Sequence, residues 1–446
     1  MTDDRRVAVI GGGITGLAAA HAIVGSGANV TVFEAGGRFG GMVLTTPFAG
    51  HPAIDEGADA FLGRVPWAVD LARKVALGDS LTSPAIGKAA VWWNGLHDIP
   101  EGLLLGLPTE LASLARSPLI SRRGKLRAAT EVLRRRTDIA ADSIGGYVRS
   151  RFGNEVHERL VDPLIGSIYA ADTDDFSLAA VPQLFEVASR SRSVLLASRR
   201  PATTASGPVF YAPSGGVGQL VDAVSTAVAA TGGDLRFDAD ISELAIDGDD
   251  WRVDGELFDG VVLACPAGAA ARLLTTVDPS VSATLTTIPT VGVALVTLAI
   301  PAHGWPVRLL GLSGYLVPKP QQRLVTAVSF ASQKWAHLAS DDHVILRVSL
   351  GRDGLSALHL SDDDLLADVL DELNLHLQFD AQPIAVRVSR WPNAFPQYRP
   401  HHGSTIAAVE RSLPSGITLA GASYHGIGIP ACIRSGQQAA AVVLQQ

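Results

Sequence analysis

The sequence predicts a mixed α/β fold in which a Rossmann-type nucleotide-binding domain is combined with a strand-rich domain and an inserted helical region. Three observations support this expectation. Residues 5–34 show a strand, a glycine-rich turn, a helix and a second strand; leucine and alanine recur at helical spacing over about 96–190; and residues 417–444 read as a strand, a glycine-rich turn and a helix. At 446 residues, the chain is long enough for about two to three structural units.

The spacing of apolar residues also predicts strands in the second half of the sequence. Short alternating runs between Leu235 and Ala264, separated by Gly and Asp, are typical of a β-meander, and a strand-rich stretch extends from Val291 to Val388. We therefore assign residues 1–65, 191–275 and 401–446 to the nucleotide-binding domain, 66–95 and 276–400 to the strand-rich substrate domain, and 96–190 to the helical region.

Composition and charge limit the classes of function. The formal net charge of -8 argues against nucleic-acid binding, which needs an excess of Lys and Arg. The two cysteines, Cys265 and Cys432, form no C-x-x-C pair, which favours a reducing cytoplasm. No apolar segment follows the first residues, and the apolar run at Val291–Ile300 is about half of the ~20 residues that span a bilayer. Only peripheral contact with the inner membrane surface remains open.

The first motif is G-x-G-x-x-G, formed by Gly11, Gly13 and Gly16 directly after a strand, with Glu34 closing the next strand. In such a motif the first glycine makes the turn, the second lets a pyrophosphate approach the backbone, and the third lets helix and strand pack closely. An acid at the position of Glu34 accepts hydrogen bonds from ribose hydroxyls. The pattern predicts a dinucleotide site with an adenosine that has a free 2'-hydroxyl.

A second glycine-rich stretch, residues 36–41 (GGRFGG), begins two residues after Glu34. Its glycines allow a close approach of the backbone, and Arg38 adds a charge-assisted donor to a second part of the pyrophosphate or to ribitol. Near the end of the chain, a strand leads to Gly421, and Pro430 stands at a favoured first position of a helix whose N-terminus could stabilise an anionic flat ring. His401, His402 and His425 lack an acid or cysteine at metal-ligand spacing, so we expect no metal site.

The E-x-x-x-R-x-G-G arrangement from Glu34 to Gly41 resembles the FAD-binding signature of the amine oxidase and porphyrinogen oxidase superfamily. Further stretches make the whole chain similar to the bacterial porphyrinogen oxidases, foremost the coproporphyrinogen III oxidases. These stretches are Asp55–Phe61, Val161–Ala170, Arg390-Trp391 with Pro396–Tyr398, and the closing Gly421–Ile433 with its G-I-G-I-P sequence.

This resemblance implies a non-covalently bound FAD. Carried over residue by residue, it places the cofactor contacts at Gly11, Gly12, Gly13, Ile14, Thr15, Gly16, Glu34, Ala35, Arg38, Gly40, Gly41, Met42, Gly57, Ala58, Ile241, Trp391, Gly421, Ile427, Gly428 and Ile429. Ile241 would contact the adenine through its backbone. Trp391 could equally be a core residue.

The resemblance also implies a reaction of haem biosynthesis. The expected chemistry is a six-electron oxidation of coproporphyrinogen III to coproporphyrin III, with flavin N5 as hydride acceptor, dioxygen as oxidant and hydrogen peroxide as by-product. No general base can be named. Protoporphyrinogen IX is the alternative substrate, and an amine oxidase or a non-catalytic flavin- or porphyrin-binding protein is the alternative class. A contact with a downstream ferrochelatase is also conceivable, and the sequence is silent on the oligomeric state.

Substrate contacts are less well defined. Lys88 lies where relatives place a polar or cationic contact, and Ser349 stands where several relatives carry an aromatic ring that packs on the substrate. Two basic clusters could hold propionates or an anionic membrane surface, or could simply be solvated helix faces. They comprise Arg122, Arg123, Lys125, Arg127, Arg134, Arg135 and Arg136, and Arg190, Arg192, Arg199 and Arg200.

Overall fold

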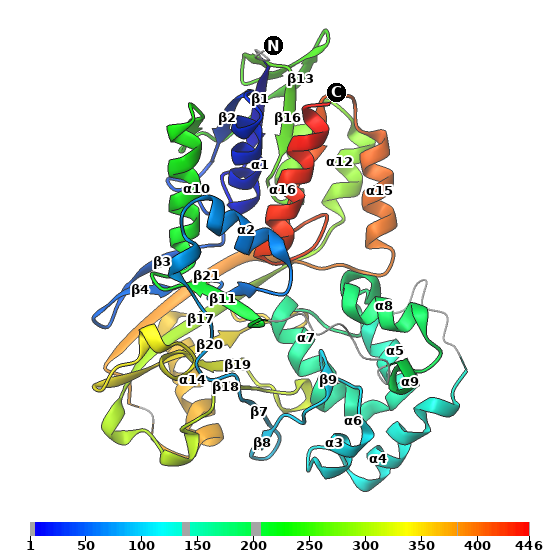
Figure 1. The fold of residues 1–446 in the computed structure, drawn as a ribbon, viewed down its shortest axis with the longest axis vertical. Coiled ribbons are helices and arrows are strands. Elements are labelled where there is room, and N and C mark those ends of the chain that lie inside the picture. Colours follow the sequence, from blue (N-terminus) through cyan, green and yellow to red (C-terminus); the bar gives the residue numbers. More distant parts are fainter. Residues whose placement is uncertain (1–4, 136–142, 198–206, 381, 446) are drawn as a thin grey trace. The chain divides into compact units, whose positions relative to one another are not determined.

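The computed structural model describes residues 5–135, 143–197, 207–380 and 382–445, and Figure 1 shows its fold. The chain forms two compact units. The first comprises Met1–Ser83, Gly207–Pro289 and Gly403–Gln446, and the second comprises Pro84–Ser206 and Thr290–His402. Several boundaries differ from our assignment: residues 66–83 and 276–289 belong to the first unit, whereas residues 191–197 and the helical region share the second unit with the strand-rich segments.

A five-stranded parallel sheet forms the centre of the first unit. Its strand order is β12 (Asp234–Arg236), β2 (Asn29–Phe33), β1 (Arg6–Ile10), β16 (Gly260–Leu263) and β22 (Ile417–Leu419). The residues of β1 from Val7 onward and all of β16 are buried, as expected of parallel strands covered on both faces. The mixed α/β, Rossmann-type prediction is confirmed, because β1 and β22 come from opposite ends of the chain and lie in one sheet.

Helix α1 (Ile14–Gly25) packs between α16 (Ile429–Val443) and α10 (Gly218–Ala230) (Figure 1). A glycine makes the first of these contacts possible: a Cβ on Gly436 would lie 2.2 Å from the Thr15 carbonyl oxygen. Helix α2 (Pro66–Lys74) also packs on α16, which explains why residues 66–83 join this unit. The other elements are β3 (Thr45–Phe48), β4 (His51–Asp55), β5 (Phe61–Leu62), β6 (Leu81–Thr82), β11 (Phe210–Pro213), β13 (Leu244–Asp247), β14 (Asp250–Val253), β15 (Glu256–Phe258), α11 (Ala267–Leu274), α12 (Pro279–Thr286) and α15 (His402–Ser412).

The second unit contains a seven-stranded sheet. Its order is β21 (Ala385–Pro396), β17 (Thr290–Pro301), β20 (His343–Leu350), β19 (Val325–Phe330), β18 (Gly314–Leu316), β7 (Ala89–Trp92) and β8 (Leu96–Asp98). Apolar residues of α14 (Asp362–Leu377), such as Leu365 and Val369, are buried in one core with Val296 and Val348 of the sheet. The expected core strand at residues 291–300 is thus the long strand β17.

The helical region begins later than predicted. Residues 96–108 form β8 and a short hairpin of β9 (Leu103–Leu104) and β10 (Leu107–Pro108), because Leu105 and Gly106 both adopt positive φ and turn the chain back. The helices that follow are α3 (Leu111–Arg116), α4 (Arg122–Ala129), η2 (Thr130–Leu133), α5 (Ile144–Phe152), α6 (Asn154–Val156), α7 (Asp162–Tyr169), α8 (Pro182–Arg190) and α9 (Val194–Ala197).

A buried ion pair fixes α7 to the loop after β20. The Arg352 guanidinium donates to both oxygens of Asp162, at 2.8 and 3.0 Å, and the two side chains are 2% and 1% exposed. The Thr173 hydroxyl donates to the same carboxylate at 2.6 Å. The Asp162 carboxylate therefore accepts three hydrogen bonds in the interior, two of them from its counter-charge, which offsets the cost of burying the pair.

Two buried histidines of the second unit make stability sensitive to acid. Burial is the main cause that lowers the pKa of His157 and of His376 from 6.5 to about 4. In the unfolded chain both rings take up a proton near pH 6.5, so the unfolded state binds more protons between pH 4 and 6.5. Stability should therefore fall on acidification through this window, by roughly 2 to 3 kcal/mol per pH unit when both rings contribute.

Urea unfolding at pH 7, 6 and 5 measures this slope. The variant His157→Gln removes one of the two rings and should lose about half of it. Identical slopes in the parent and the variant would show that His157 is not held neutral in the folded state.

Candidate functional site

The glycine-rich turn after β1 is shaped by contacts that exclude side chains. Gly11 has a φ of +111°, and a Cβ there would lie 2.6 Å from the Ala264 carbonyl oxygen. A Cβ on Gly16 would lie 1.9 Å from the Gly11 carbonyl oxygen. Gly13 differs, because a Cβ there would meet only the Gly41 Cα at 4.0 Å. The fold requires glycine at the first and third positions, whereas Gly13 faces open space.

Helix α1 starts at this open space. Gly13 is its N-cap residue, and no side chain caps the helix. The N–H groups of a helix's first turn need acceptors, and together with the helix dipole they favour an anion. The first turn of α1 is thus suited to a phosphate group.

Glu34 follows β2 and lies against the same turn. One oxygen of its carboxylate accepts from the Gly12 N–H at 2.7 Å, and the other accepts from the Gly36 N–H at 2.8 Å. A carboxylate has about four acceptor positions, so two remain for hydroxyls. The two backbone N–H groups orient the carboxylate at the carboxyl edge of the parallel sheet.

Arg38 holds the second glycine-rich loop in shape. Its guanidinium donates to the carbonyls of Phe39, Val43 and Gly41, at 3.0, 2.9 and 2.6 Å. This loop joins the first one, because the Gly40 N–H donates to the Gly12 carbonyl at 2.9 Å. Several N–H groups of Arg38 thus donate to the loop itself. The predicted contact of Arg38 with a ligand stays a prediction.

Three further predicted segments are held by neighbouring elements of the same unit. Gly421 lies beside α1, since a Cβ there would be 3.4 Å from the Thr15 Oγ1. The stretch that leads to buried Ile241 is tied to Glu34 by the Ala239 N–H, which donates to the Glu34 carbonyl at 2.9 Å. Gly57 and Ala58 follow β4, whose last residue, Asp55, accepts from the N–H of Val217 at the start of α10.

The closing turn delivers a second helix N-terminus. Gly428 has a φ of +105° and is the N-cap of α16, with no side-chain cap. His425 is bound on both sides: its Nε2 lies 2.6 Å from the Glu410 Oε1 of α15, and its carbonyl accepts from Arg434 of α16 at 3.0 Å. The turn that contains Ile427 is therefore held in place by the two helices that flank it.

Sequence reasoning missed the residues that support this arrangement. Glu410 and Arg434 hold the closing turn, and the Ser435 hydroxyl accepts from the Gly421 N–H at 3.0 Å. The Ser423 hydroxyl accepts from the Ala267 N–H after β16. Only the helical spacing of Arg434 and Ser435 behind Pro430 could have indicated that they face back toward the turn.

The remaining predicted site residues lie in the second unit. Trp391 is on β21 opposite Val293, half-buried. Lys88 immediately precedes β7, is largely exposed, and pairs with Asp98 at 2.9 Å. Ser349 is on β20, on the sheet face opposite α14. Side chains alternate between the two faces of a strand, so Lys88 should share a face with Ala90, which is buried in the core with α14. Lys88 and Ser349 therefore start from opposite faces of the sheet.

The basic clusters are partly described. Arg122, Arg123, Arg134 and Arg135 are exposed, whereas Arg127 donates to backbone carbonyls of α5. Arg136, Arg199 and Arg200 lie outside the described residues. Within the described ranges, no helix is long and apolar enough to cross a membrane, and no group of three or more His, Cys, Asp or Glu side chains is arranged to hold a metal.

Taken together, the first unit offers a cradle of two glycine-rich loops, two uncapped helix N-termini and one carboxylate. This combination fits a dinucleotide: the helix N-termini suit anionic groups, and Glu34 suits a ribose. The residues Gly11 to Gly16, Glu34, Ala35, Gly40, Gly41, Ile241 and Gly421 lie in contiguous parts of this cradle.

Comparison with known proteins agrees with this geometry. Residues 14–444 match the family described as flavin containing amine oxidoreductase. The chain is similar to coproporphyrinogen III oxidase of Bacillus subtilis, with 31% identity over 98% of both chains. It is also similar to protoporphyrinogen oxidase 2 of Arabidopsis thaliana, with 24% identity over 99% of this chain and 94% of the relative.

Among solved structures, one from Exiguobacterium sp. 255-15, provisionally named a protoporphyrinogen oxidase, matches with a TM-score of 0.87. The identity is 28%, and the match covers 100% of both chains. The predicted amine oxidase-like fold is confirmed by this likeness.

Proposed function

Because the chain belongs to the family of flavin-containing amine oxidoreductases, we propose that it is the FAD-dependent oxidase that converts coproporphyrinogen III to coproporphyrin III in haem biosynthesis. The observation that carries this proposal is the full-length likeness to a bacterial coproporphyrinogen III oxidase. The likeness to a protoporphyrinogen oxidase at lower identity makes protoporphyrinogen IX the alternative substrate.

The cradle of the first unit supports the cofactor part of the proposal. When bound, FAD supplies a hydride acceptor that dioxygen can reoxidise with formation of hydrogen peroxide. The first turn of α1 and the glycine-rich loops would hold the pyrophosphate, Glu34 would accept from the ribose, and the backbone near Ile241 would meet the adenine. The turn at Gly428 would bring the N-terminus of α16 to the flavin ring, where its partial positive charge favours a negatively charged ring.

The cofactor is proposed to be bound without a covalent bond. Cys432 is buried, and burial raises the pKa of its thiol, so little thiolate is available to attack a flavin. Its side chain also bonds to Thr15 of α1, which orients it toward helix packing. Denaturation of the purified protein should release all of the flavin into the supernatant.

The proposed substrate contacts come from residues of the second unit. Lys88 precedes β7 and starts from the sheet face opposite to Ser349, so it is proposed to meet a propionate at the rim of the macrocycle, exchanging its exposed partner Asp98 for the substrate carboxylate. Ser349 is proposed to face the macrocycle with a small side chain instead of an aromatic ring. We assign no general base among the described residues, and we propose that solvent takes up the pyrrole N–H proton.

Substrate preference tests the proposal directly. We expect kcat/KM, measured by peroxide release and porphyrin fluorescence, to be at least tenfold higher with coproporphyrinogen III than with protoporphyrinogen IX, which is about 1.4 kcal/mol of discrimination. The reverse preference would move the protein to the later, two-propionate substrate.

The protein is proposed to act in the cytoplasm on a diffusible tetrapyrrole and dioxygen. Its exposed basic residues would allow a peripheral contact with the inner membrane surface. A contact with a ferrochelatase would pass the porphyrin on to metal insertion.

A further inference from the structure

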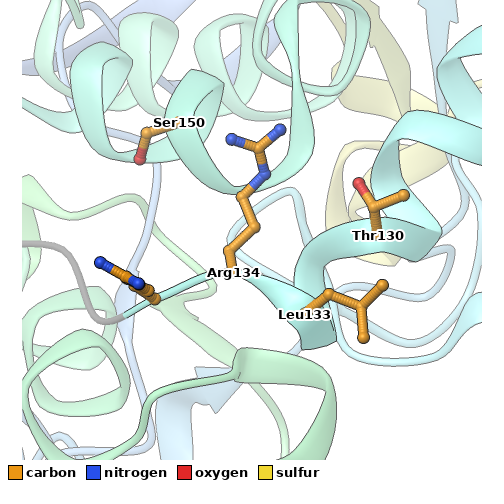
Figure 2. Close-up of a pocket in the computed structure, with 5 residues that line it drawn as sticks. Thr130, Leu133, Arg134 and Ser150 are labelled. Atoms are coloured by element: carbon orange, nitrogen blue, oxygen red, sulfur yellow. The ribbon is translucent and has the colours of Figure 1, made fainter.

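A pocket in the helical region carries a concentration of positive charge that the proposed oxidation does not use. It has a volume of about 570 Å³ and is lined by Thr130, Leu133, Arg134, Arg135 and Ser150 (Figure 2). The Arg134 side chain extends into the space between Thr130 and Ser150. Leu133 forms an apolar edge and is 79% exposed.

The walls of the pocket are held by buried interactions. Arg151 is buried, pairs with Glu131 of η2 and donates to the Arg135 carbonyl at 2.7 Å. Arg127 of α4 donates to the carbonyls of Ser150 and Arg151 at 2.9 Å each, which fixes the end of α5. Both backbone segments that line the pocket are therefore anchored before any ligand binds, which lowers the entropic cost of binding.

Among the described residues, no carboxylate forms an ion pair with Arg134 or Arg135 of this pocket. Among the residues that the structure describes, Glu131 is the acid nearest to Arg134 along the sequence, but its carboxylate is occupied by Arg151, by the Ser193 hydroxyl and by the Val194 N–H. In the part of the chain that the structure describes, the neighbouring ion pairs join Arg149 to Asp174, Arg151 to Glu131 and Arg159 to Glu155, and none includes Arg134 or Arg135.

The cations also raise the local potential. Burial first, and then the charges of Arg134 and Arg151, lower the pKa of Arg127 below its ordinary value. Like charges are thus crowded here in a protein whose formal net charge is -8. An anion that enters the pocket would relieve this repulsion.

The polar groups define the class of anion. The Thr130 hydroxyl donates to the Arg127 carbonyl, and the Ser150 hydroxyl donates to the Tyr147 carbonyl, at 2.7 Å each. Their protons are used, so the donors left for a ligand are the guanidinium N–H groups of Arg134 and Arg135. Guanidinium groups suit a phosphate, which offers several oxygens and up to two negative charges.

We propose that this pocket is a phosphate-binding site, additional to the oxidase centre. The phosphate could belong to an anionic phospholipid, whose chains would meet exposed Leu133 and Leu126, or to a small phosphorylated metabolite. Both sources present the same oxygens to Arg134 and Arg135, and they differ in whether an apolar chain accompanies them.

The test uses the full-length, FAD-loaded protein and the double variant Arg134→Gln/Arg135→Gln. The matched control is Arg122→Gln/Arg123→Gln, which removes the same charge from exposed positions of α4 outside the pocket. Each protein is titrated with inorganic phosphate by calorimetry and sedimented with phosphatidylglycerol vesicles, using phosphatidylcholine vesicles as the uncharged reference. Thermal unfolding checks that both variants are folded.

The expected result is a loss of affinity of roughly 10- to 30-fold in the pocket variant and a much smaller loss in the control. Binding of free phosphate would identify a soluble source, and binding of anionic vesicles alone would identify a lipid. Absence of binding in both assays, or equal losses in the two variants, would overturn the site. Oxidase activity is measured separately, so failure of this site leaves the proposed reaction untouched.

Discussion

Replacement of Gly13 by Val should give a folded protein that no longer holds FAD. The φ and ψ of Gly13, -67° and 174°, are accessible to any residue, and a Cβ there meets nothing closer than 4.0 Å. The added side chain would fill the space in front of the first turn of α1, where the pyrophosphate is proposed to bind. Loss of one or two hydrogen bonds to charged oxygens costs roughly 3 kcal/mol, so FAD affinity should fall about 100-fold.

The matched control is Gly25→Val at the other end of α1, where a Cβ meets nothing within 4 Å. This variant should bind FAD like the parent, as judged by flavin fluorescence quenching. Gly16→Ala provides the opposite contrast, because its Cβ would lie 1.9 Å from the Gly11 carbonyl oxygen and disrupt the turn itself. A Gly13→Val protein that retains full FAD affinity would refute the proposed position of the pyrophosphate.

The second large effect concerns the buried pair Asp162–Arg352. Replacement of Asp162 by Ala should lower the free energy of unfolding by about 3 to 5 kcal/mol, since it leaves the Arg352 guanidinium buried without a counter-charge. The exposed pair Lys88–Asp98 is the matched control, because its side chains are 58% and 66% exposed. Asp98→Asn should change stability by less than about 1 kcal/mol.

Chemical unfolding of both variants measures the difference. The double variant Asp162→Leu/Arg352→Met removes both charges and should recover much of the lost stability, as replacement of buried pairs by apolar residues often does. Equal small losses for Asp162→Ala and Asp98→Asn would mean that the Asp162 site is accessible to water.

Much of the nucleotide-binding unit could be predicted because its signals are local. The apolar run of β1, the glycine turn and the helix α1 lie within 20 residues of one another, and the predicted span of residues 5–34 agrees with Arg6 to Phe33, from the start of β1 to the end of β2. The closing strand and helix could be predicted equally well, since Pro430 marks the start of α16 and Gly428 is its N-cap. Such signals depend on backbone chemistry and not on distant partners.

The parts that were missed depend on partners far along the chain. Asp162 and Arg352 are separated by 190 residues, and no periodicity links them. The hairpin at residues 103–108 was predicted as helix because its leucines have no strand alternation, while its turn is formed by Leu105 and Gly106, both at positive φ. For Arg38, the residue type indicated a donor to a ligand, but the neighbouring carbonyls compete for the same N–H groups.

The most direct test of the account is to mix the FAD-loaded protein with coproporphyrinogen III in the absence of oxygen. We predict that the yellow colour of the flavin bleaches and that it returns when oxygen is admitted, with three molecules of peroxide for each coproporphyrin, as a six-electron oxidation in two-electron rounds requires. A flavin that stays yellow with either porphyrinogen but bleaches with an amine would contradict the account and make the protein an amine oxidase.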